Sequence, residues 1–322
     1  MTKLICMANA DKIEGTKTST DLPGTYHTPV LLAEVIEGLS IQSGGIYVDC
    51  TFGGGGHSKA ILEKIGSTGK LIVFDQDASA KQHKPPDERV IFVQHNFRHL
   101  QRFLRVNKAV KVDGILADLG VSSHQFNEAE RGFSIRFDAA LDMRMDNRQT
   151  LTAADVIKQF PELQLQKMFE KYGEVTNAKT LAKTIVAQRS IAAIKTISQF
   201  REAIKKVVKG NPNKYLAQVF QALRIEVNDE MGALKEMLEQ SVAVLKPGGR
   251  IAVISFHSLE DRMVKNFFKQ GTFEEVQPDD VFGIRPETSL KIITKKPILP
   301  GKAEQKINTR SRSAKLRIAE KK

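Results

Sequence analysis

The chain has 322 residues and a net charge of +12, with 41% hydrophobic and 27% charged residues, which is the composition of an ordinary globular protein. Its longest strand-like apolar run covers residues 251–256, so the sequence excludes a membrane-spanning helix, which needs about 18 apolar residues. The only two cysteines, Cys6 and Cys50, exclude a disulfide framework and a cysteine-based zinc site. We therefore expect a soluble, cytoplasmic protein with one large domain or two smaller ones.

The first part of the chain predicts alternating strands and helices. Residues 27–39 have helical apolar spacing, with Thr28 as the N-cap and Pro29 at the first helical position. Short runs rich in Ile, Val, Leu and Phe predict strands at residues 46–51, 70–75, 90–94 and 112–118. Helix-like segments at 58–65 and 97–106 follow two of them. Repeated strand–helix units predict a doubly wound, parallel sheet.

The pattern changes at about residue 127. Residues 152–228 are predicted to be helical almost throughout, with Thr152 and Ser198 as N-caps and Pro161 opening a further helix. The α/β pattern then resumes with a helix at 229–244 and a strand at 250–256. Strands at 290–296 and 313–319 alternate well enough to pair antiparallel at a sheet edge.

This pattern predicts an α/β fold interrupted by an all-helical insertion. The N-terminal extension, residues 1–25, is expected to be disordered. The α/β domain is discontinuous and comprises residues 26–126 and 229–322, and the helical insertion comprises residues 127–228.

Two segments carry the net positive charge of the chain. Residues 151–215 hold 12 Lys or Arg against 5 Asp or Glu, and residues 291–322 hold 11 against 2. Two basic islands on a nearly neutral body are typical of a protein that binds a polyanion such as RNA. Their alternative interpretation is a pair of solvated helical faces and a frayed tail.

A glycine-rich loop joins the first predicted strand to the next helix. The strand ends at Asp49 and leads into TFGGGGHS, residues 51–58. Glycines at this place let the backbone approach a ligand closely and direct free N–H groups toward it. The loop lacks the Gly-Lys-Ser/Thr ending of a phosphate-binding loop, and Ser58 stands where a dinucleotide-binding loop needs its third glycine. A flexible turn without a ligand is the alternative interpretation.

Two further acids follow strands of the same predicted sheet. Asp75 ends the second strand, 22 residues after Gly53, where its carboxylate can accept hydrogen bonds from a ribose diol. Asp118 ends the fourth strand, where the carboxyl end of a central strand opens onto the ligand crevice. Acids beside a glycine loop fit S-adenosyl-L-methionine, whose sulfonium and ammonium groups are positively charged. Simple capping of the following turns would also explain both acids.

Long blocks of the sequence resemble one known family, the bacterial methyltransferases that modify N4 of a cytidine in the decoding region of small-subunit (16S) ribosomal RNA. The matching blocks span about nine-tenths of the chain; they are YHTPVLLAEVI, YVDCTFGGGGHS, DGILADLGVSSHQ, AERGFS, LDMRMD, QALRIEVNDE, LKPGGRIAVISFHSLEDRMVKNFF and RSRSAKLRIAE. The resemblance implies a class I, Rossmann-like methyltransferase sheet with a helical substrate-recognition insertion. The segment RGFSIRFDAALDMRMD departs from the family pattern at Ile135 and Ala139-Ala140.

The resemblance also implies site residues, a cofactor and a substrate. The cofactor is S-adenosyl-L-methionine, and its expected contacts are Gly55, Gly56, His57, Asp75, Phe97, Asp118 and Gln125. Asp118 is the expected catalytic residue, because it can orient the cytosine amine and accept its proton. Phe126 and Phe133 are candidates to stack on the target base, although packing roles explain both. No metal site is expected, and the transfer of a methyl group needs none.

The basic islands supply candidate phosphate contacts for a 16S rRNA or small-subunit substrate. Such contacts position RNA without reading its sequence. The candidates are Lys179, Lys183, Arg189, Lys205 and Lys206 in the insertion, and Arg310, Arg312, Lys315 and Arg317 near the C-terminus. The oligomeric state stays open, a homodimer included.

Four other functions fit the sequence less well. A methyltransferase for DNA amino groups would carry prolines and an aromatic residue after Asp118, where Leu119, Gly120 and Val121 stand instead. A non-catalytic RNA-binding or ribosome-assembly protein would not need an intact glycine loop together with Asp75 and Asp118. An NAD-dependent oxidoreductase is disfavoured by Ser58. Methylation at cytosine C5 would need a cysteine nucleophile, and neither cysteine follows a late strand.

Overall fold

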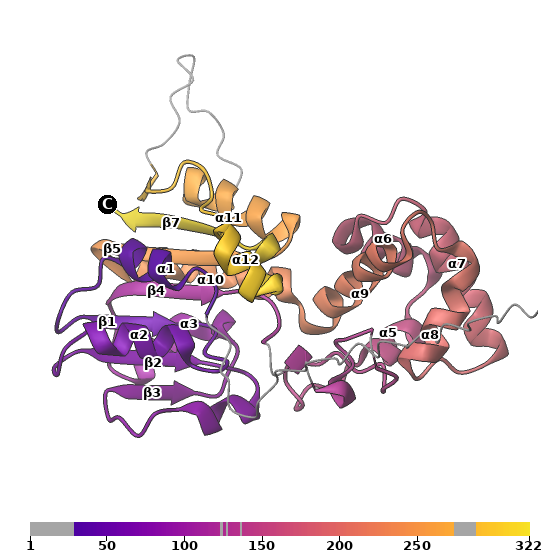
Figure 1. Ribbon diagram of the computed structural model, residues 1–322, viewed down its shortest axis with the longest axis horizontal. Coiled ribbons are helices and arrows are strands. Elements are labelled where there is room, and N and C mark those ends of the chain that lie inside the picture. The colour runs from indigo at the N-terminus through magenta and orange to yellow at the C-terminus, as the bar shows by residue number, and fades with distance from the viewer. Residues whose placement is uncertain (1–28, 123–124, 127, 136, 274–287) are drawn as a thin grey trace, which may run out of the picture.

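A computed structural model describes residues 29–122, 125–126, 128–135, 137–273 and 288–322. Its centre is a seven-stranded sheet with the order β3-β2-β1-β4-β5-β7-β6 (Figure 1). The strands are β1 (Ile46–Asp49), β2 (Lys70–Phe74), β3 (Val90–Val93), β4 (Val112–Asp118), β5 (Leu245–Ser255), β6 (Leu290–Ile292) and β7 (Lys315–Lys321). The first five are parallel, and β7 pairs antiparallel with both β5 and β6.

Helices cover both faces of the sheet, because its central strands are apolar on both sides. One face packs against α1 (Leu32–Leu39) and α2 (Gly56–Lys64), and the other against α3 (Leu100–Val106), α10 (Glu230–Val244) and α11 (Ser258–Gln270). The short helices η1 (Ala78–His83) and η2 (Phe97–His99) follow β2 and β3. The predicted doubly wound α/β fold is therefore confirmed.

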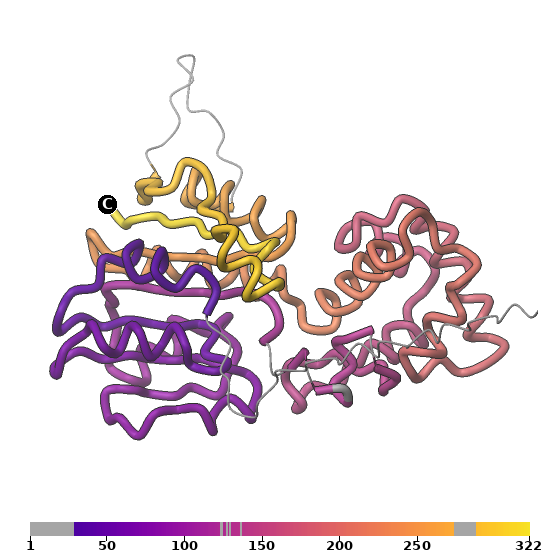
Figure 2. Tube along the Cα trace, viewed as in Figure 1, coloured from indigo at the N-terminus to yellow at the C-terminus, as the bar shows by residue number. Residues whose placement is uncertain are grey.

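The region between β4 and α10 is helical and has a hydrophobic core of its own. Its helices are η3 (Ala129–Arg131), α5 (Ala153–Gln159), α6 (Glu162–Gly173), α7 (Ala178–Ile191), α8 (Ile197–Ile204), η4 (Lys205–Val207) and α9 (Pro212–Asn228). Phe169, Leu181, Phe200 and Leu223 are buried in this core. Figures 1 and 2 show these helices beyond the carboxyl ends of the parallel strands. The insertion therefore faces the edge of the sheet where ligands bind in such folds.

Several predicted boundaries differ from the structure. Thr152 caps α5 as predicted, in a capping box with Asp155, whereas α8 is capped by Thr196 with Gln199 rather than by Ser198. The strand predicted at 250–256 begins at Leu245, with a register shift where it pairs with β4. Two short helices near the C-terminus, α12 (Lys302–Ile307) and η5 (Thr309–Ser313), were not predicted.

Two expectations concern residues outside the described ranges, namely the extension 1–25 and the cap Thr28. Among the helices of the described ranges, none is both long enough and apolar enough to span a membrane. The departures at Ala139 and Ala140 lie in a local strand pairing, since the Ala139 carbonyl accepts a hydrogen bond from the Ile197 N–H (3.0 Å) and Leu141 donates to the Lys195 carbonyl (2.9 Å).

Candidate active site

The glycine loop runs from the carboxyl end of β1 to the first turn of α2. Gly53 and Gly55 have φ values of 52° and 76°, a conformation that favours glycine, and Gly55 is the N-cap of α2. Asp49 lies beneath the loop and is buried; it accepts hydrogen bonds from the Thr51 N–H (3.0 Å) and the Ser58 hydroxyl (2.7 Å). Burial raises the pKa of Asp49. Asp49 therefore shapes the loop from below rather than facing a ligand.

Asp75 holds the loop from the neighbouring strand. One of its carboxylate oxygens accepts a hydrogen bond from the Gly53 N–H (2.8 Å), and the other accepts one from the Asp77 N–H (2.9 Å). Burial raises the pKa of Asp75 to about 6, although both hydrogen bonds oppose this shift. Each carboxylate oxygen can still accept another hydrogen bond, so Asp75 keeps the capacity to bind a diol.

Gln125 lies behind Asp75 in a buried network around Asp77. Its side-chain amide donates to Asp77 (2.9 Å) and its amide oxygen accepts from the Ser122 N–H (3.1 Å). Arg131 forms a salt bridge with the same oxygen of Asp77 (2.9 Å). Burial opposes ionisation of Asp77, but the hydrogen bonds from Gln125 and Ser79 outweigh it and lower the pKa of this carboxyl group. This network ties the segment after β4 to the segment after β2.

Phe97 begins η2 directly after β3 and is half-buried, packed against the core that includes α3 and α10. The preceding residue, Asn96, donates a side-chain hydrogen bond to Gln76 (3.0 Å). The loops after β2 and β3 are thus linked at the same edge of the sheet. One part of the ring remains accessible there, as an adenine contact requires.

Asp118 ends β4 at the centre of this edge. Its backbone N–H donates to the Thr51 hydroxyl (2.7 Å), which fixes β4 against the glycine loop. Its Oδ2 lies 3.7 Å from His57 Nδ1, and its buried Oδ1 has no hydrogen-bond partner among the described residues. Burial raises the pKa of Asp118 to about 6; His57 lowers it, whereas Asp49 and Glu260 raise it. A buried carboxylate oxygen without a donor is costly to the fold and marks a place for a substrate donor.

A second polar cluster lies at the end of the adjacent strand β5. His257, not Ser258, is the N-cap of α11 and forms a capping box with Glu260, which is buried and accepts from the Phe256 N–H (2.8 Å). Possible ligand atoms of Glu230, His257 and Glu260 lie within 4.8 Å of one another. However, both oxygens of Glu230 accept hydrogen bonds from Arg224 (2.7 and 2.9 Å). Protein partners therefore already account for Glu230, whereas the buried Nε2 of His257 has no hydrogen-bond partner among the described residues and lies 3.2 Å from Glu260 Oε1.

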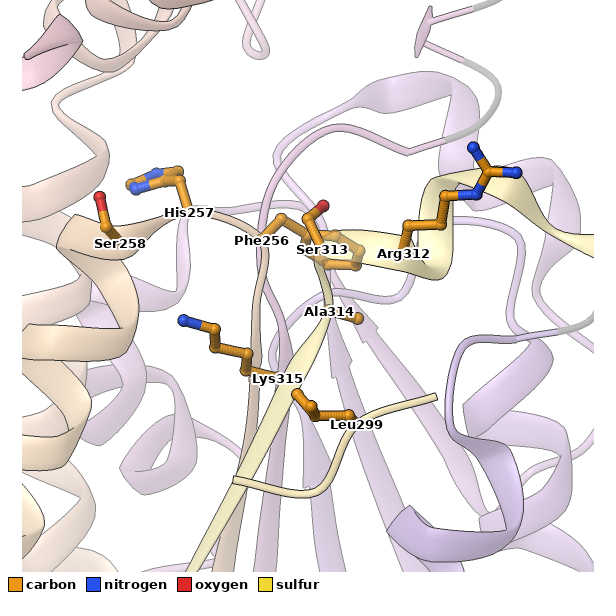
Figure 3. A pocket seen from close by; sticks show the side chains of 8 residues that line it. All are labelled: Phe256, His257, Ser258, Leu299, Arg312, Ser313, Ala314 and Lys315. Carbon is orange, nitrogen blue, oxygen red and sulfur yellow. The ribbon is translucent and has the colours of Figure 1, made fainter. Parts of the chain in front are cut away.

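A pocket of about 290 Å³ opens beside this cluster, between the end of β5 and the start of β7. Figure 3 shows its lining, which comes from the turn after β5 and the start of α11, from the loop before α12, and from the segment between η5 and the start of β7. The lining residues are Phe256, His257, Ser258, Leu299, Arg312, Ser313, Ala314 and Lys315. Two predicted phosphate contacts, Arg312 and Lys315, thus lie on the β5–β7 side of Asp118, opposite the glycine loop.

The other predicted RNA contacts have different environments. The side chains of Lys179, Lys183, Lys205 and Lys206 are exposed on the insertion. Arg189 donates to the carbonyls of Ile157 (2.7 Å) and Phe160 (2.8 Å), so it also stabilises the end of α5. Two predicted stacking residues are occupied within the protein: Phe133 is buried, and the guanidinium of Arg310 lies 4.7 Å from the ring centroid of Phe126.

The predicted phosphate contact at Arg317 disagrees with the structure. It is only 7% exposed, and its Nε donates to Asp261 (2.6 Å), which also pairs with Lys315 (3.4 Å). β7 is not an edge strand, because β6 lies outside it, and α11 packs over it. Arg317 is therefore part of the interior and is removed from the candidate RNA contacts.

Sequence reasoning missed three residues that build the site, namely Thr51, Asp77 and Arg131. Their partners are 67, 48 and 54 residues away in the sequence. Only Arg131 had a signal in the sequence, because it lies in the AERGFS block. That block indicates that the segment matters but does not reveal Asp77 as the partner of Arg131.

The parallel sheet with an antiparallel β7 beside β5, together with the glycine loop and the acids at the ends of β2 and β4, defines a class I methyltransferase that uses S-adenosylmethionine. The MraW methylase family matches residues 24–322, and the chain belongs to this family. Three relatives bear the name "Ribosomal RNA small subunit methyltransferase H". The protein from Flavobacterium johnsoniae is 54% identical over 92% of this chain and 98% of its own length. Those from Bacteroides thetaiotaomicron and Parabacteroides distasonis are both 53% identical over 92% of this chain and 98% and 97% of their own lengths.

Proposed function

We propose that the chain transfers a methyl group from S-adenosylmethionine to N4 of a cytidine in the decoding region of 16S ribosomal RNA. Family membership supports methylation of small-subunit rRNA. The observation that carries the choice of an amine acceptor is Asp118, a half-buried carboxylate whose buried Oδ1 has no donor among the described residues. An exocyclic amine is a hydrogen-bond donor and releases a proton when it is methylated, so it fits this oxygen in both respects.

The residues present fit the cofactor. Gly53 and Gly55 hold a backbone cradle in conformations that side chains rarely adopt, and a Cβ on Gly55 would meet the Phe52 ring at 3.0 Å. Asp75 would hold the ribose hydroxyls, and Phe97 would pack on the adenine. Gly56 and His57 would contribute backbone from the first turn of α2, and Gln125 would act through the loop that it stabilises. When bound, S-adenosylmethionine supplies a methyl group activated by a positively charged sulfur.

The chain's own contribution to the reaction is orientation and proton transfer. The lone pair of N4 is delocalised into the cytosine ring, so the amine must be held with its lone pair turned toward the methyl carbon. Asp118 Oδ1 would accept one N4–H and fix this orientation. As the N–C bond forms, the proton moves from N4 to Asp118, and the electrons of the N–H bond remain on nitrogen.

The basic surfaces would bind the RNA around the target base. Exposed lysines of the insertion and the pocket residues Arg312 and Lys315 lie beyond the carboxyl edge and on its β5–β7 side. Such contacts position a polyanion without reading its sequence. The insertion would therefore determine the affinity for RNA, and residues at the carboxyl edge of the sheet would carry out the methyl transfer.

The test is methyl transfer from labelled S-adenosylmethionine to small ribosomal subunits that lack decoding-region methylation, followed by nucleoside mass spectrometry. We expect N4-methylcytidine with the wild-type protein and none with Asp118→Asn. Free 16S rRNA and duplex DNA serve as parallel acceptors. Label on DNA alone would favour a DNA amino-methyltransferase, and cofactor binding without label on any acceptor would favour a non-catalytic assembly protein.

A further inference from the structure

The side chain of His57 is fixed in one tautomer by the fold. Its Nε2 lies 2.9 Å from the carbonyl oxygen of Val30, and both groups are buried. A carbonyl oxygen can only accept a hydrogen bond, so Nε2 must carry a proton. In a neutral imidazole the other nitrogen, Nδ1, therefore has a lone pair and no proton.

This lone pair faces Asp118, since Nδ1 lies 3.7 Å from Asp118 Oδ2. A lone pair opposite an ionised carboxylate oxygen is unfavourable in a buried site, because neither group is a donor. One proton on Nδ1 removes the conflict, because the imidazolium and the carboxylate then form an ion pair at this distance. The arrangement therefore favours a single proton held between the two residues.

Among the charged groups around Asp118, His57 is the one that favours ionisation of its carboxyl group. The groups that act electrostatically on Asp118 are His57 from α2, Asp49 from β1 and Glu260 from α11. Asp49 and Glu260 are both acids, and both oppose ionisation of Asp118. Glu260 has His257 and Arg224 as its own favourable charges. Of these three groups, only His57 stabilises the carboxylate form of Asp118.

We infer that His57 is the proton partner of Asp118, a positioning residue that keeps this carboxylate able to take the proton released by the methylated amine. The inference deepens the proposed function and rests on it. In the reaction, the N4–H bond breaks and an O–H bond forms on Asp118. The positive charge of the pair remains on His57, whose Nε2–H still donates to Val30. No oxidant, metal or further reactant is needed.

His57→Gln separates the two roles of the imidazole. A glutamine amide can still donate to the Val30 carbonyl, but it cannot take up a proton. Without His57, Asp118 loses its one favourable charge, so its pKa should rise above about 6. Methyl transfer would then need a higher pH. We expect the acid limb of the single-turnover rate to move to higher pH, with a loss of about tenfold near pH 6 for each unit moved and a much smaller loss near pH 9.

The control is His99→Gln, the same change at an exposed residue outside the site, which should leave the profile unchanged. Cofactor binding by calorimetry and thermal unfolding show whether His57→Gln is folded and loaded. An equal fall in rate at every pH, or an unchanged profile, would overturn the inference. If wild type transfers no methyl group to any RNA, the proposed function fails instead, and this is visible before any variant is compared.

A second measurement does not depend on turnover or on the variant's stability. Nitrogen-15 NMR of the histidine side chains in wild type and in Asp118→Asn reports which ring nitrogens carry protons. We expect Nε2 of His57 to carry a proton in both proteins, and Nδ1 to differ between them, because only wild type holds a carboxylate 3.7 Å from Nδ1. The same protonation pattern in both proteins, or Nδ1 as the protonated nitrogen of the neutral ring, would overturn the inference.

Discussion

The carboxyl edge of the sheet and the surface of the helical insertion use charge in opposite ways. At the edge, a few acids are buried or half-buried at defined places: Asp49 holds the loop, Asp75 spans two strands, and Asp118 keeps a buried oxygen without a donor. On the insertion, the charges are numerous and exposed, and the side chain of Lys205, for example, is 71% exposed.

This difference predicts different responses to mutation. A buried carboxylate acts in a low dielectric, so its charge and position each have a large effect. Each exposed lysine makes only a small, screened contribution to RNA binding. Replacing one lysine should therefore have little effect, whereas replacing several should weaken binding. Edge residues should therefore control turnover and cofactor affinity, while insertion residues should control RNA affinity and its salt dependence.

The largest effect is expected at Asp118. Asp118→Asn keeps the shape of the side chain but removes the proton acceptor, so the turnover rate should fall by about 10² to 10⁴ while RNA binding stays nearly unchanged. Single-turnover kinetics and filter binding measure the two quantities. The matched control is Asp113→Asn on the same strand, where the carboxylate pairs with Lys246 (2.8 Å) away from the crevice. Wild-type turnover in Asp118→Asn would show that the catalytic assignment is wrong.

Asp75 should affect the cofactor rather than the chemistry. Asp75→Asn replaces a pure acceptor by a group with an N–H donor, which must face either the Gly53 N–H or the Asp77 N–H. Hydrogen bonds to charged groups contribute about 1.5–3 kcal/mol, so calorimetry should show S-adenosylmethionine binding weaker by about 10- to 100-fold. Asp87→Asn, at a half-buried acid that is paired with Arg89 outside the glycine loop, is the control. Unchanged affinity would contradict the ribose role.

The insertion lysines should act as a group. Changing Lys179, Lys183, Lys205 and Lys206 together to Glu should weaken RNA binding by roughly tenfold or more at physiological salt. The slope of log affinity against log salt should fall by about 0.7–0.9 for each phosphate that the variant no longer neutralises. Turnover at saturating RNA should be nearly unchanged. The control is the double variant Lys64→Glu and Lys70→Glu. It makes the same kind of substitution at exposed lysines of the α/β domain, away from the carboxyl edge. Losses of affinity in proportion to the charge change in both variants would mean that binding follows net charge alone.

Local patterns in the sequence predicted the part of the site that lies at strand ends. β4 matches its predicted bounds, 112–118, and the starts of β1, β2 and β3 also match, because short apolar runs ending in an acid or glycine are strong local signals. The pattern of these runs is sufficient to place Asp75, Asp118 and the glycine loop at one edge of the sheet.

Residues whose environment depends on distant partners could not be predicted in this way. Asp77 meets Arg131 across 54 residues, and no periodicity encodes that distance. Serine is the commoner capping residue, yet α11 is capped by His257 and not by Ser258, because the buried Glu260 forms the capping box with His257. The clustering of charge in the C-terminal segment likewise concealed that its arginines have different environments.

Arg312 and Arg317 lie in the same basic segment, but one resembles the residues of the insertion and the other resembles those of the carboxyl edge. Arg312 lines the pocket and is exposed, like the lysines of the insertion, whereas Arg317 is buried against Asp261, like the acids of the edge. Arg317→Ala should lower the free energy of unfolding by about 1–3 kcal/mol, because it leaves Asp261 without its closest partner. Arg312→Ala should leave stability nearly unchanged and weaken RNA binding slightly, by less than the combined change of the insertion lysines.

The pH dependence of unfolding tests the same contrast. Burial opposes ionisation of Asp261, but the bonds from Arg317 outweigh it, so the pKa of Asp261 is lowered in the folded protein. The contribution of this pair is therefore complete above the unfolded pKa of about 3.9 and is lost as the pH falls through the lower folded value. The stability difference between wild type and Arg317→Ala should be constant from about pH 5 to 8 and shrink below about pH 4. If the stability difference between wild type and Arg317→Ala stays the same at lower pH, the stabilisation comes from packing of the aliphatic part of the arginine side chain. The ion pair with Asp261 would then contribute little.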